Sequence, residues 1–129
     1  MRSLNKVMLI GHLAADPELR QTKNEHPVAT FSLATNRDWI TGSGEAKKAT
    51  DFHRIVVWGK PAETVSKYCV KGMAVYVEGR LTNRSYEGKD GNKKFITEVV
   101  CSSFNMLSYK KNAEGVEQLD VKDPGENGK

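Results

Sequence analysis

The sequence predicts a mainly β fold in which one helix lies between the third and fourth of five strands. Five stretches are rich in β-branched and aromatic residues, and several of them alternate apolar with polar side chains, as half-buried strands do. One further stretch places its apolar residues at helical spacing. Five strands with a helix in this position is the order of the OB-fold, a five-stranded Greek-key barrel.

The first two strands are predicted at residues 4–13 and 28–36. The first, LNKVMLIGHL, is apolar with β-branched members, and the second, VATFSLATN, alternates apolar and polar side chains. The segments that follow them, residues 14–27 and 37–49, contain an Asp-Pro pair and two glycines respectively, so both are predicted as loops. The second of these loops carries Trp39, which is expected to be exposed.

The third strand, residues 50–58, divides into two faces because side chains alternate along a strand. One face is apolar enough to be the core side and holds His53, Ile55 and Val57. The opposite face holds Phe52, Arg54, Val56 and Trp58. Aromatic side chains on an outer face need a ligand or a partner surface to cover them.

A helix is predicted over residues 61–71, since Pro61 suits its first position and Gly72 suits a left-handed residue after its end. The fourth strand is predicted at residues 73–82 and the last at residues 95–107. Glu-Gly and Asp-Gly turn signals between them indicate a protruding hairpin.

The chain is predicted to form one OB-fold domain, residues 1–108, followed by a disordered tail, residues 109–129. Residues 1–109 hold 16 Lys/Arg against 11 Asp/Glu, whereas residues 110–129 hold 4 against 5. The basic domain favours a polyanionic partner, but an excess this small is weak support on its own.

Several classes of function find no support in the sequence. Cys69 and Cys101 form no CxxC pair and are interpreted as two buried thiols, and the histidines do not cluster, so no metal is expected. No nucleophile elbow, P-loop or HExxH motif occurs, so neither an enzyme nor a cofactor is expected. Without an apolar run long enough to cross a membrane, or a signal segment, the expected location is the cytoplasm, in association with the nucleoid.

Four aromatic side chains on the predicted strands and long loops each have a cation close by in the sequence: Trp39, Phe52, Trp58 and Tyr86. Stacking of an unpaired base on an aromatic ring contributes about 1–3 kcal/mol. Arginine can stack on a base or pair with a phosphate. Proteins that read duplex DNA usually present a helix to a groove, so this arrangement favours single strands.

Other interpretations of these residues stay open. Phe52 and Trp58 also suit a subunit interface, because interfaces favour aromatic side chains. Arg54 is a candidate ion-pair partner of Asp51 or Glu78. The alternative functions are an RNA-binding OB module and an OB protein of the primosome type that mainly binds other proteins.

The chain contains six stretches, in order, that together extend over about residues 3–107: NKVMLIGHLAADPELR, VATFSLAT, DFHRIVVWGK, AETVSKYCVKG, VYVEGRLTNRSY and TEVV. In these stretches it resembles the bacterial-type single-stranded DNA-binding proteins. The resemblance implies an OB-fold that assembles as a homotetramer with single-stranded DNA wrapped around its exterior. It also implies protection of single strands in replication, repair and recombination.

The resemblance further implies roles for individual residues. The base-stacking aromatics would be Trp39, Phe52, Trp58 and Tyr86, although family members commonly have Trp in place of Phe52 and Tyr86, and Phe in place of Trp58. The basic contacts to DNA would be Lys6, Arg54, Lys60, Lys71 and Arg84. His53 matches a position at the subunit interface.

The end of the chain departs from the family pattern. Members usually close with a disordered linker and an acidic tip ending in Pro-Phe, which recruits replication and repair proteins. This chain ends in DPGENGK, which is expected of a truncated chain or of a variant that does not recruit partners in this way. Recruitment through such a tip is therefore not carried over.

Overall fold

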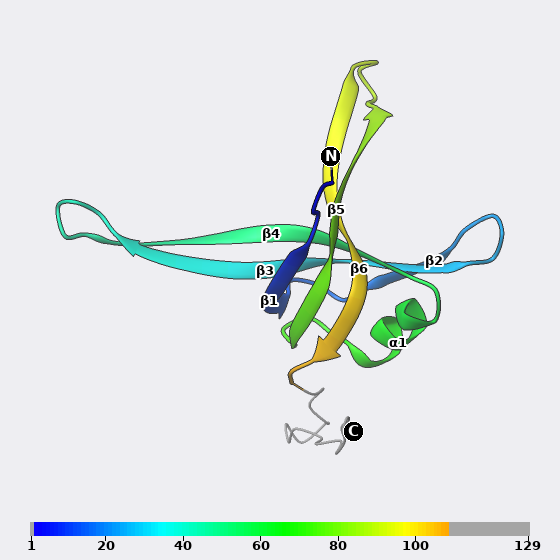
Figure 1. Ribbon diagram of the computed structural model, residues 1–129, viewed down its shortest axis with the longest axis horizontal. Helices are drawn as coiled ribbons and strands as arrows, with labels where there is room; N and C mark the ends of the chain where they lie inside the picture. The colour runs from blue at the N-terminus through cyan, green and yellow to red at the C-terminus, as the bar shows by residue number, and fades with distance from the viewer. Residues whose placement is uncertain (1, 109–129) are drawn as a thin grey trace.

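The computed structural model describes residues 2–108 and contains six strands and one helix (Figure 1). The predicted tail, residues 109–129, lies outside the described residues. In chain order the elements are β1 (Val7–Leu13), β2 (Glu18–Gln21), β3 (Pro27–Ile40), β4 (Ala46–Trp58), α1 (Lys60–Tyr68), β5 (Ala74–Glu87) and β6 (Lys93–Met106).

All six strands belong to one sheet with the order β1-β5-β6-β4-β3-β2, and β1 also pairs with β3. This additional pairing joins His12 to Ala34 and Leu13 to Leu33, so that β1, β3, β4, β5 and β6 close into a barrel. β4 and β6 are parallel, whereas the other paired strands are antiparallel. The predicted five-stranded barrel, with its helix between the third and fourth barrel strands, is confirmed, and β2 is an added short strand.

Aliphatic side chains from alternate strand positions fill the barrel, as the period of two requires. The predicted inward residues of β3, β4 and β5 are buried except His53, which is half-buried, and Ala62 and Val65 of α1 join them. The buried strand residues of this core are Leu13, Ala29, Phe31, Leu33, Ile55, Val57, Val75, Val77 and Val99. The outer faces of the same strands are thereby left to form the surface.

Closure of the barrel depends on a close approach between β1 and β3. A Cβ atom on Gly11 would lie 2.3 Å from the carbonyl oxygen of Ala34 on β3. Only a residue without a side chain allows two backbones to come this near each other. Glycine at position 11 therefore fits the point where the two strands meet.

Two hairpins extend beyond the barrel as arms (Figure 1). We call residues 35–51 of β3 and β4 the β3–β4 arm, and residues 83–97 of β5 and β6 the β5–β6 arm. The pairing of β3 with β4 continues to Ile40 and Ala46, and that of β5 with β6 continues to Glu87 and Lys93. The protruding hairpin predicted between the last two strands is confirmed.

Two segments predicted as loops contain strand residues. Within residues 14–27, Glu18–Gln21 form β2 by pairing with β3. Within residues 37–49, the β3–β4 ladder extends to Ile40, so Trp39 lies on a strand and not in a loop. These sequences lack a clear alternation of polarity, and cross-strand hydrogen bonds stabilise them as strands instead.

Some boundaries and burial also differ from the predictions. The helix predicted to reach residue 71 ends at Tyr68, because Cys69 is extended with φ −102° and ψ 140°. Gly72 has the expected positive φ of 92°, but in the turn before β5. Cys69 is buried as predicted, whereas Cys101 is only half-buried.

Candidate nucleic-acid interface

An open groove of about 340 Å³ lies on the outer face of the barrel, over β3 and β4. Its walls come from the end of β2 on one side and from β5 and β6 on the other. It therefore brings together residues that are far apart in the sequence. The lining residues are Arg20, Gln21, Thr22, Val28, Thr30, Arg54, Val56, Trp58, Arg84 and Glu98.

The outer face of β4 supplies the middle of this groove. Trp58 is 49% exposed, and Phe52, further along the same face, is 64% exposed. Val56 lies between them in the row but is buried, since it pairs with Thr30 of β3 on one side and Val100 of β6 on the other. The row thus places the exposed Trp58 ring in the groove and the exposed Phe52 ring beyond its lining, with Arg54 and Val56 between them.

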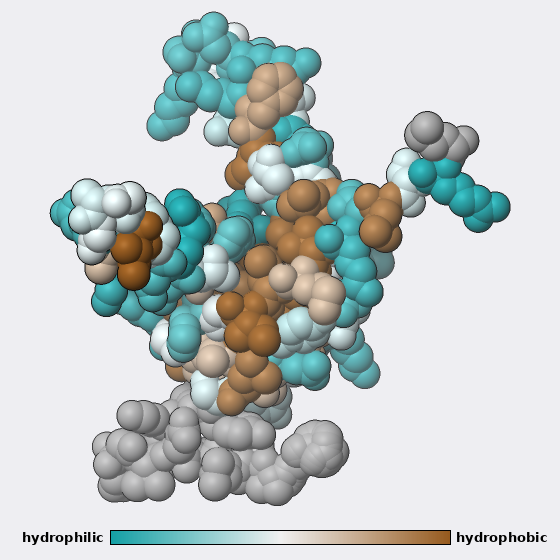
Figure 2. Space-filling view, turned by 60° about the vertical axis from the view of Figure 1, so that its left-hand side comes forward, coloured by the Kyte–Doolittle hydropathy of each residue, from teal (hydrophilic) through white to brown (hydrophobic). Residues whose placement is uncertain are grey.

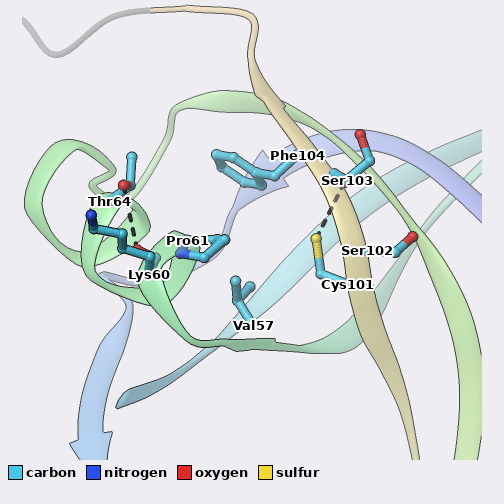
Figure 3. Close-up of a pocket in the computed structure, with 8 residues that line it drawn as sticks. All are labelled: Val57, Lys60, Pro61, Thr64, Cys101, Ser102, Ser103 and Phe104. Carbon is cyan, nitrogen blue, oxygen red and sulfur yellow. Dashed lines mark hydrogen bonds between the residues drawn. The ribbon is translucent and has the colours of Figure 1, made fainter. Parts of the chain in front are cut away.

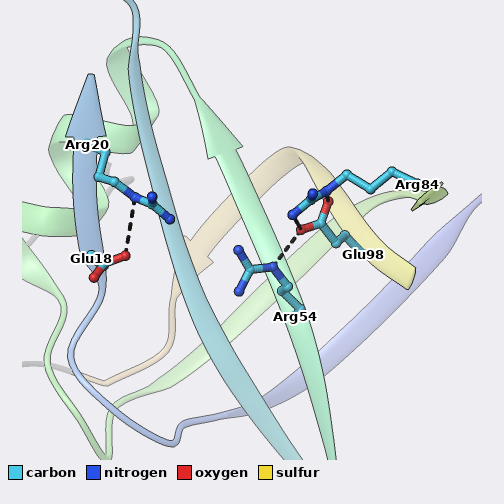
Figure 4. A network of polar contacts seen from close by, with 5 residues as sticks. All are labelled: Glu18, Arg20, Arg54, Arg84 and Glu98. Atoms are coloured by element: carbon cyan, nitrogen blue, oxygen red, sulfur yellow. Dashed lines mark hydrogen bonds and ion pairs between the residues drawn. The ribbon is translucent and has the colours of Figure 1, made fainter. Parts of the chain in front are cut away.

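Arg54 occupies the same row and is held by Glu98 of β6 (Figure 4). Arg54 Nε donates to Glu98 Oε2 at 2.5 Å. Arg84 of β5 donates from Nε to Oε1 at 3.0 Å and from Nη2 to Oε2 at 3.1 Å. The Glu98 side chain is only 7% exposed, and a carboxylate so buried needs such partners. We call Arg54, Glu98 and Arg84 the arginine–glutamate triad.

The sequence-based candidates for the partner of Arg54 were wrong. Asp51 is paired instead with Arg37, at 2.8 Å, and Glu78 with Lys6, at 3.5 Å. Local spacing in the sequence could not have identified Glu98 as the partner of Arg54. Glu98 is 44 residues further along the chain, on β6, and the pairing of β6 with β4 brings the two side chains together.

The triad shifts the pKa values of Glu98 and Arg84. Hydrogen bonds from Arg84 and then from Arg54 hold the pKa of Glu98 below its ordinary value, although burial opposes them. The hydrogen bond to Glu98 in turn raises the pKa of Arg84. The Glu98 carboxylate and the Arg84 guanidinium are therefore charged at neutral pH.

The β5–β6 arm continues this surface. Arg84 pairs in register with Ile96 and Tyr86 with Lys94, so these side chains share one face with Glu98. Tyr86 is half exposed at the outer end of that face. A line of aromatic and cationic groups thus runs from Trp58 through the triad to Tyr86.

Trp39 does not lie on this face. Phe52 pairs with Ala34 of β3, and Trp39 is an odd number of residues from Ala34 along the same strand. Because side chains alternate along a strand, the Trp39 and Phe52 rings lie on opposite faces of the arm. The guanidinium of Arg37 lies 5.2 Å from the centre of the Trp39 ring, a cation–π distance. Trp39 is therefore an exposed aromatic with an adjacent cation, but outside the groove.

The three predicted lysine contacts also lie outside the groove. Lys6 precedes β1 and pairs with Glu78 of β5. Lys71 lies in the turn after α1, where its backbone N–H donates to Asp16. Lys60 begins α1 and lines a second pocket of about 340 Å³ together with Val57, Pro61, Thr64, Cys101, Ser102, Ser103 and Phe104 (Figure 3).

His53, predicted at a subunit interface, is half-buried where the β3–β4 arm leaves the barrel. Its Nε2 atom lies 2.8 Å from the Thr35 hydroxyl oxygen. Its pairing partner on β3 is the core residue Leu33, which agrees with its position on the core side of the strand.

Several groove residues were missed from the sequence. Arg20, Gln21 and Thr22 fall within residues 14–27, a segment predicted as a loop. Glu98 is a charged residue within an apolar strand, at a position that alternation assigns to the outer face. A charged residue in an apolar strand could have identified Glu98 as a candidate site residue, but the sequence does not show that its partners are Arg54 and Arg84.

An apolar surface lies away from the groove. Met8 and Ile10 project from the outer face of β1 and are 61% and 65% exposed. Figure 2 shows apolar side chains gathered over the body of the molecule, between two arms that are mainly polar. β5 pairs with one edge of β1, and β3 pairs with the other edge only at His12 and Leu13, so this second edge of residues 7–10 pairs with no strand within residues 2–108.

Comparison with known proteins accounts for the fold. A sequence model described as "Single-strand binding protein family" matches residues 4–107. The chain belongs to this family. It is 49% identical to Single-stranded DNA-binding protein 1 of Chlorobaculum tepidum, over 88% of this chain and 71% of that protein. It is 46% identical to Single-stranded DNA-binding protein 3 of Listeria innocua, over 87% of this chain and 69% of that protein.

Solved structures of single-strand binding proteins share the barrel. One, described as "Plasmodium falciparum SSB complex with ssDNA", has a TM-score of 0.77 and 39% identity, covering 83% of this chain and 97% of that chain. A single-stranded DNA binding protein from Thermus aquaticus, in a deletion mutant, has a TM-score of 0.72 and 34% identity, covering 81% and 50% respectively.

The lowered pKa of Glu98 predicts how stability responds to acid. A carboxylate whose pKa is lower in the folded than in the unfolded chain stabilises the fold above its unfolded pKa, about 4.3. We expect this contribution to be lost as the pH falls from there through the folded pKa. Urea unfolding between pH 7 and pH 3 should show a smaller acid loss for Glu98→Gln than for the unsubstituted protein. Parallel pH profiles for the two proteins would contradict this assignment.

Proposed function

We propose that this protein binds single-stranded DNA without sequence preference and protects it during replication, repair and recombination. The observation that carries the proposal is the groove, in which Trp58 adjoins the arginine–glutamate triad. Membership of the single-strand binding protein family supports the same function. The relative whose structure is described as a complex with ssDNA is built on the same barrel.

The proposed binding combines two kinds of contact. Trp58, Phe52 and Tyr86 stack on unpaired bases, and each ring is about half exposed or more. Arg54 and Arg84 attract phosphates between the stacked bases, which releases counterions and makes the affinity fall with salt. Duplex DNA binds weakly to such a surface because its bases are already stacked on one another.

The predicted contacts outside the groove extend this path. Trp39 offers a stacking ring on the far side of the β3–β4 arm, and Lys6, Lys60 and Lys71 offer cations elsewhere on the protein surface. A strand wrapped around the exterior would meet several faces in turn, so contacts need not share one groove. These four residues are proposed as DNA contacts on that basis.

We also propose that the protein acts as a homotetramer. The exposed Met8 and Ile10 and the open edge of β1 give a second copy both apolar surface and unpaired backbone groups to bind. His53 is proposed to support a subunit interface by fixing the base of the β3–β4 arm through Thr35.

Binding alone accounts for this activity, without catalysis or a cofactor. Within residues 2–108, no three metal-binding side chains lie together. None of the helices described there is long and apolar enough to cross a membrane. The proposed location is the cytoplasm, on the nucleoid DNA.

Trp58→Ala tests the stacking contact. Loss of one stacked base should weaken binding of oligo-dT by about 1–3 kcal/mol, or roughly 5- to 150-fold. Trp58→Phe should retain most of the affinity because it keeps an aromatic ring. Fluorescence or calorimetric titration at one salt concentration, repeated with oligo-U, measures both the loss and the preference for DNA over RNA.

Tyr68→Ala is the matched control for Trp58→Ala. Tyr68 is also half exposed beside a cation, Lys67, but it lies on α1 outside the groove. Its replacement should leave the affinity unchanged. Equal affinities for Trp58→Ala and the unsubstituted protein would rule out stacking at Trp58.

Sedimentation tests the assembly. The protein should sediment at about four times the 14.4 kDa mass of the chain. Ile10→Asp places a charge in the proposed interface and should give smaller species at the same concentration, with unchanged circular dichroism. Ile40→Asp, at the exposed end of the β3–β4 arm, should remain tetrameric. A monomeric unsubstituted protein would refute the tetramer.

A further inference from the structure

Glu98 is a negative charge placed within a surface that is otherwise suited to phosphate. It lines the groove beside Arg54 and Arg84, and its side chain is 7% exposed. Both of its oxygens accept hydrogen bonds from guanidinium groups. A phosphate bound at either arginine would therefore share that arginine with an internal anion.

The remaining donors of the triad point to where a phosphate can bind. Glu98 accepts hydrogen bonds from Nε of Arg54 and from Nε and Nη2 of Arg84. Both Nη atoms of Arg54, and Nη1 of Arg84, make no hydrogen bond within residues 2–108. The two side chains are 37% and 53% exposed, so these donors are accessible from the groove.

The charges of the triad do not cancel. Two guanidinium groups and one carboxylate leave one net positive charge, where two arginines alone would present two. Because Glu98 is nearly buried and lies within hydrogen-bond distance of both cations, salt screens this compensation only weakly. Glu98 thus lowers the attraction of the groove for phosphate while holding both guanidinium groups in place.

We propose that Glu98 is a positioning residue that also limits the affinity for DNA, acting as an internal counter-ion for Arg54 and Arg84. This inference rests on the proposed function, since it concerns phosphates bound in the same groove. A free strand binds by sharing the arginines with Glu98. When the strand leaves, Glu98 still neutralises part of their charge, so release costs less than from two uncompensated cations.

Glu98→Gln tests this role, because it keeps the shape of the side chain and removes its charge. We expect affinity for oligo-dT at about 50 mM salt to rise roughly 3- to 10-fold. The plot of log affinity against log salt should steepen by about 0.7, the value for one more neutralised phosphate on a single strand. A merely structural role for Glu98 would not steepen this dependence.

Glu63→Gln is the matched control. It makes the same change in net charge on α1, outside the groove, and should change neither affinity nor salt dependence appreciably. Circular dichroism and sedimentation should confirm that each variant keeps its fold and mass. An equal or weaker affinity for Glu98→Gln, with an unchanged salt slope, would overturn the proposal.

A second pair of variants removes the risk that two unpaired arginines destabilise Glu98→Gln. In the background of Arg84→Gln only Arg54 faces position 98. The double variant Arg84→Gln/Glu98→Gln should bind oligo-dT more tightly than Arg84→Gln alone, with a steeper salt slope. Equal or weaker binding by the double variant would overturn the inference. Absence of oligo-dT binding by the unsubstituted protein would instead refute the proposed function.

Discussion

The short parallel contact between β4 and β6 is the constraint on which both the core and the groove depend. It pairs Ile55 with Val99 and Val56 with Val100. On the inner side, Ile55 and Val99 are buried in the barrel. On the outer side, the same contact brings Glu98 within hydrogen-bond distance of Arg54. Loss of this pairing would open the barrel and would also separate Arg54 from Glu98.

This arrangement explains how β4 serves two functions at once. Alternate side chains of β4 build the core, so the strand cannot shift by one residue without burying Arg54 and exposing Ile55. The aromatic rings on its outer face are therefore fixed by the packing beneath them. A surface prepared in this way loses little conformational entropy when it binds a flexible strand.

The fold was largely predictable because its signal is local. Alternation along β3, β4 and β5 identified the inward residues, and Pro61 marked the start of α1. The β3–β4 arm was harder to predict, because residues such as Trp39 belong to a polar ladder whose strand structure depends on cross-strand partners. β2 was missed for the same reason: only its pairing with β3 makes it a strand.

The candidate site was predictable in part. Period two placed Arg54 and Trp58 on the outer face of β4, and the structure brings both into the groove with Arg84. The partner of Arg54 could not be read from the sequence, since Glu98 is 44 residues away and is brought close by a parallel pairing. Likewise, Lys60 and Lys71 resemble the other cations in sequence, but α1 and the turn after it carry them away from the groove.

Photo-cross-linking tests the central claim most directly, that the outer face of β4 and the β5–β6 arm meets single-stranded DNA. An oligo-dT containing 5-iodouracil can be irradiated on the protein and the attached peptides identified by mass spectrometry. The account predicts cross-links at Trp58, Phe52 and Tyr86, suppressed by excess unmodified oligo-dT. Cross-links confined to the Met8 and Ile10 face, with none in the groove, would contradict it.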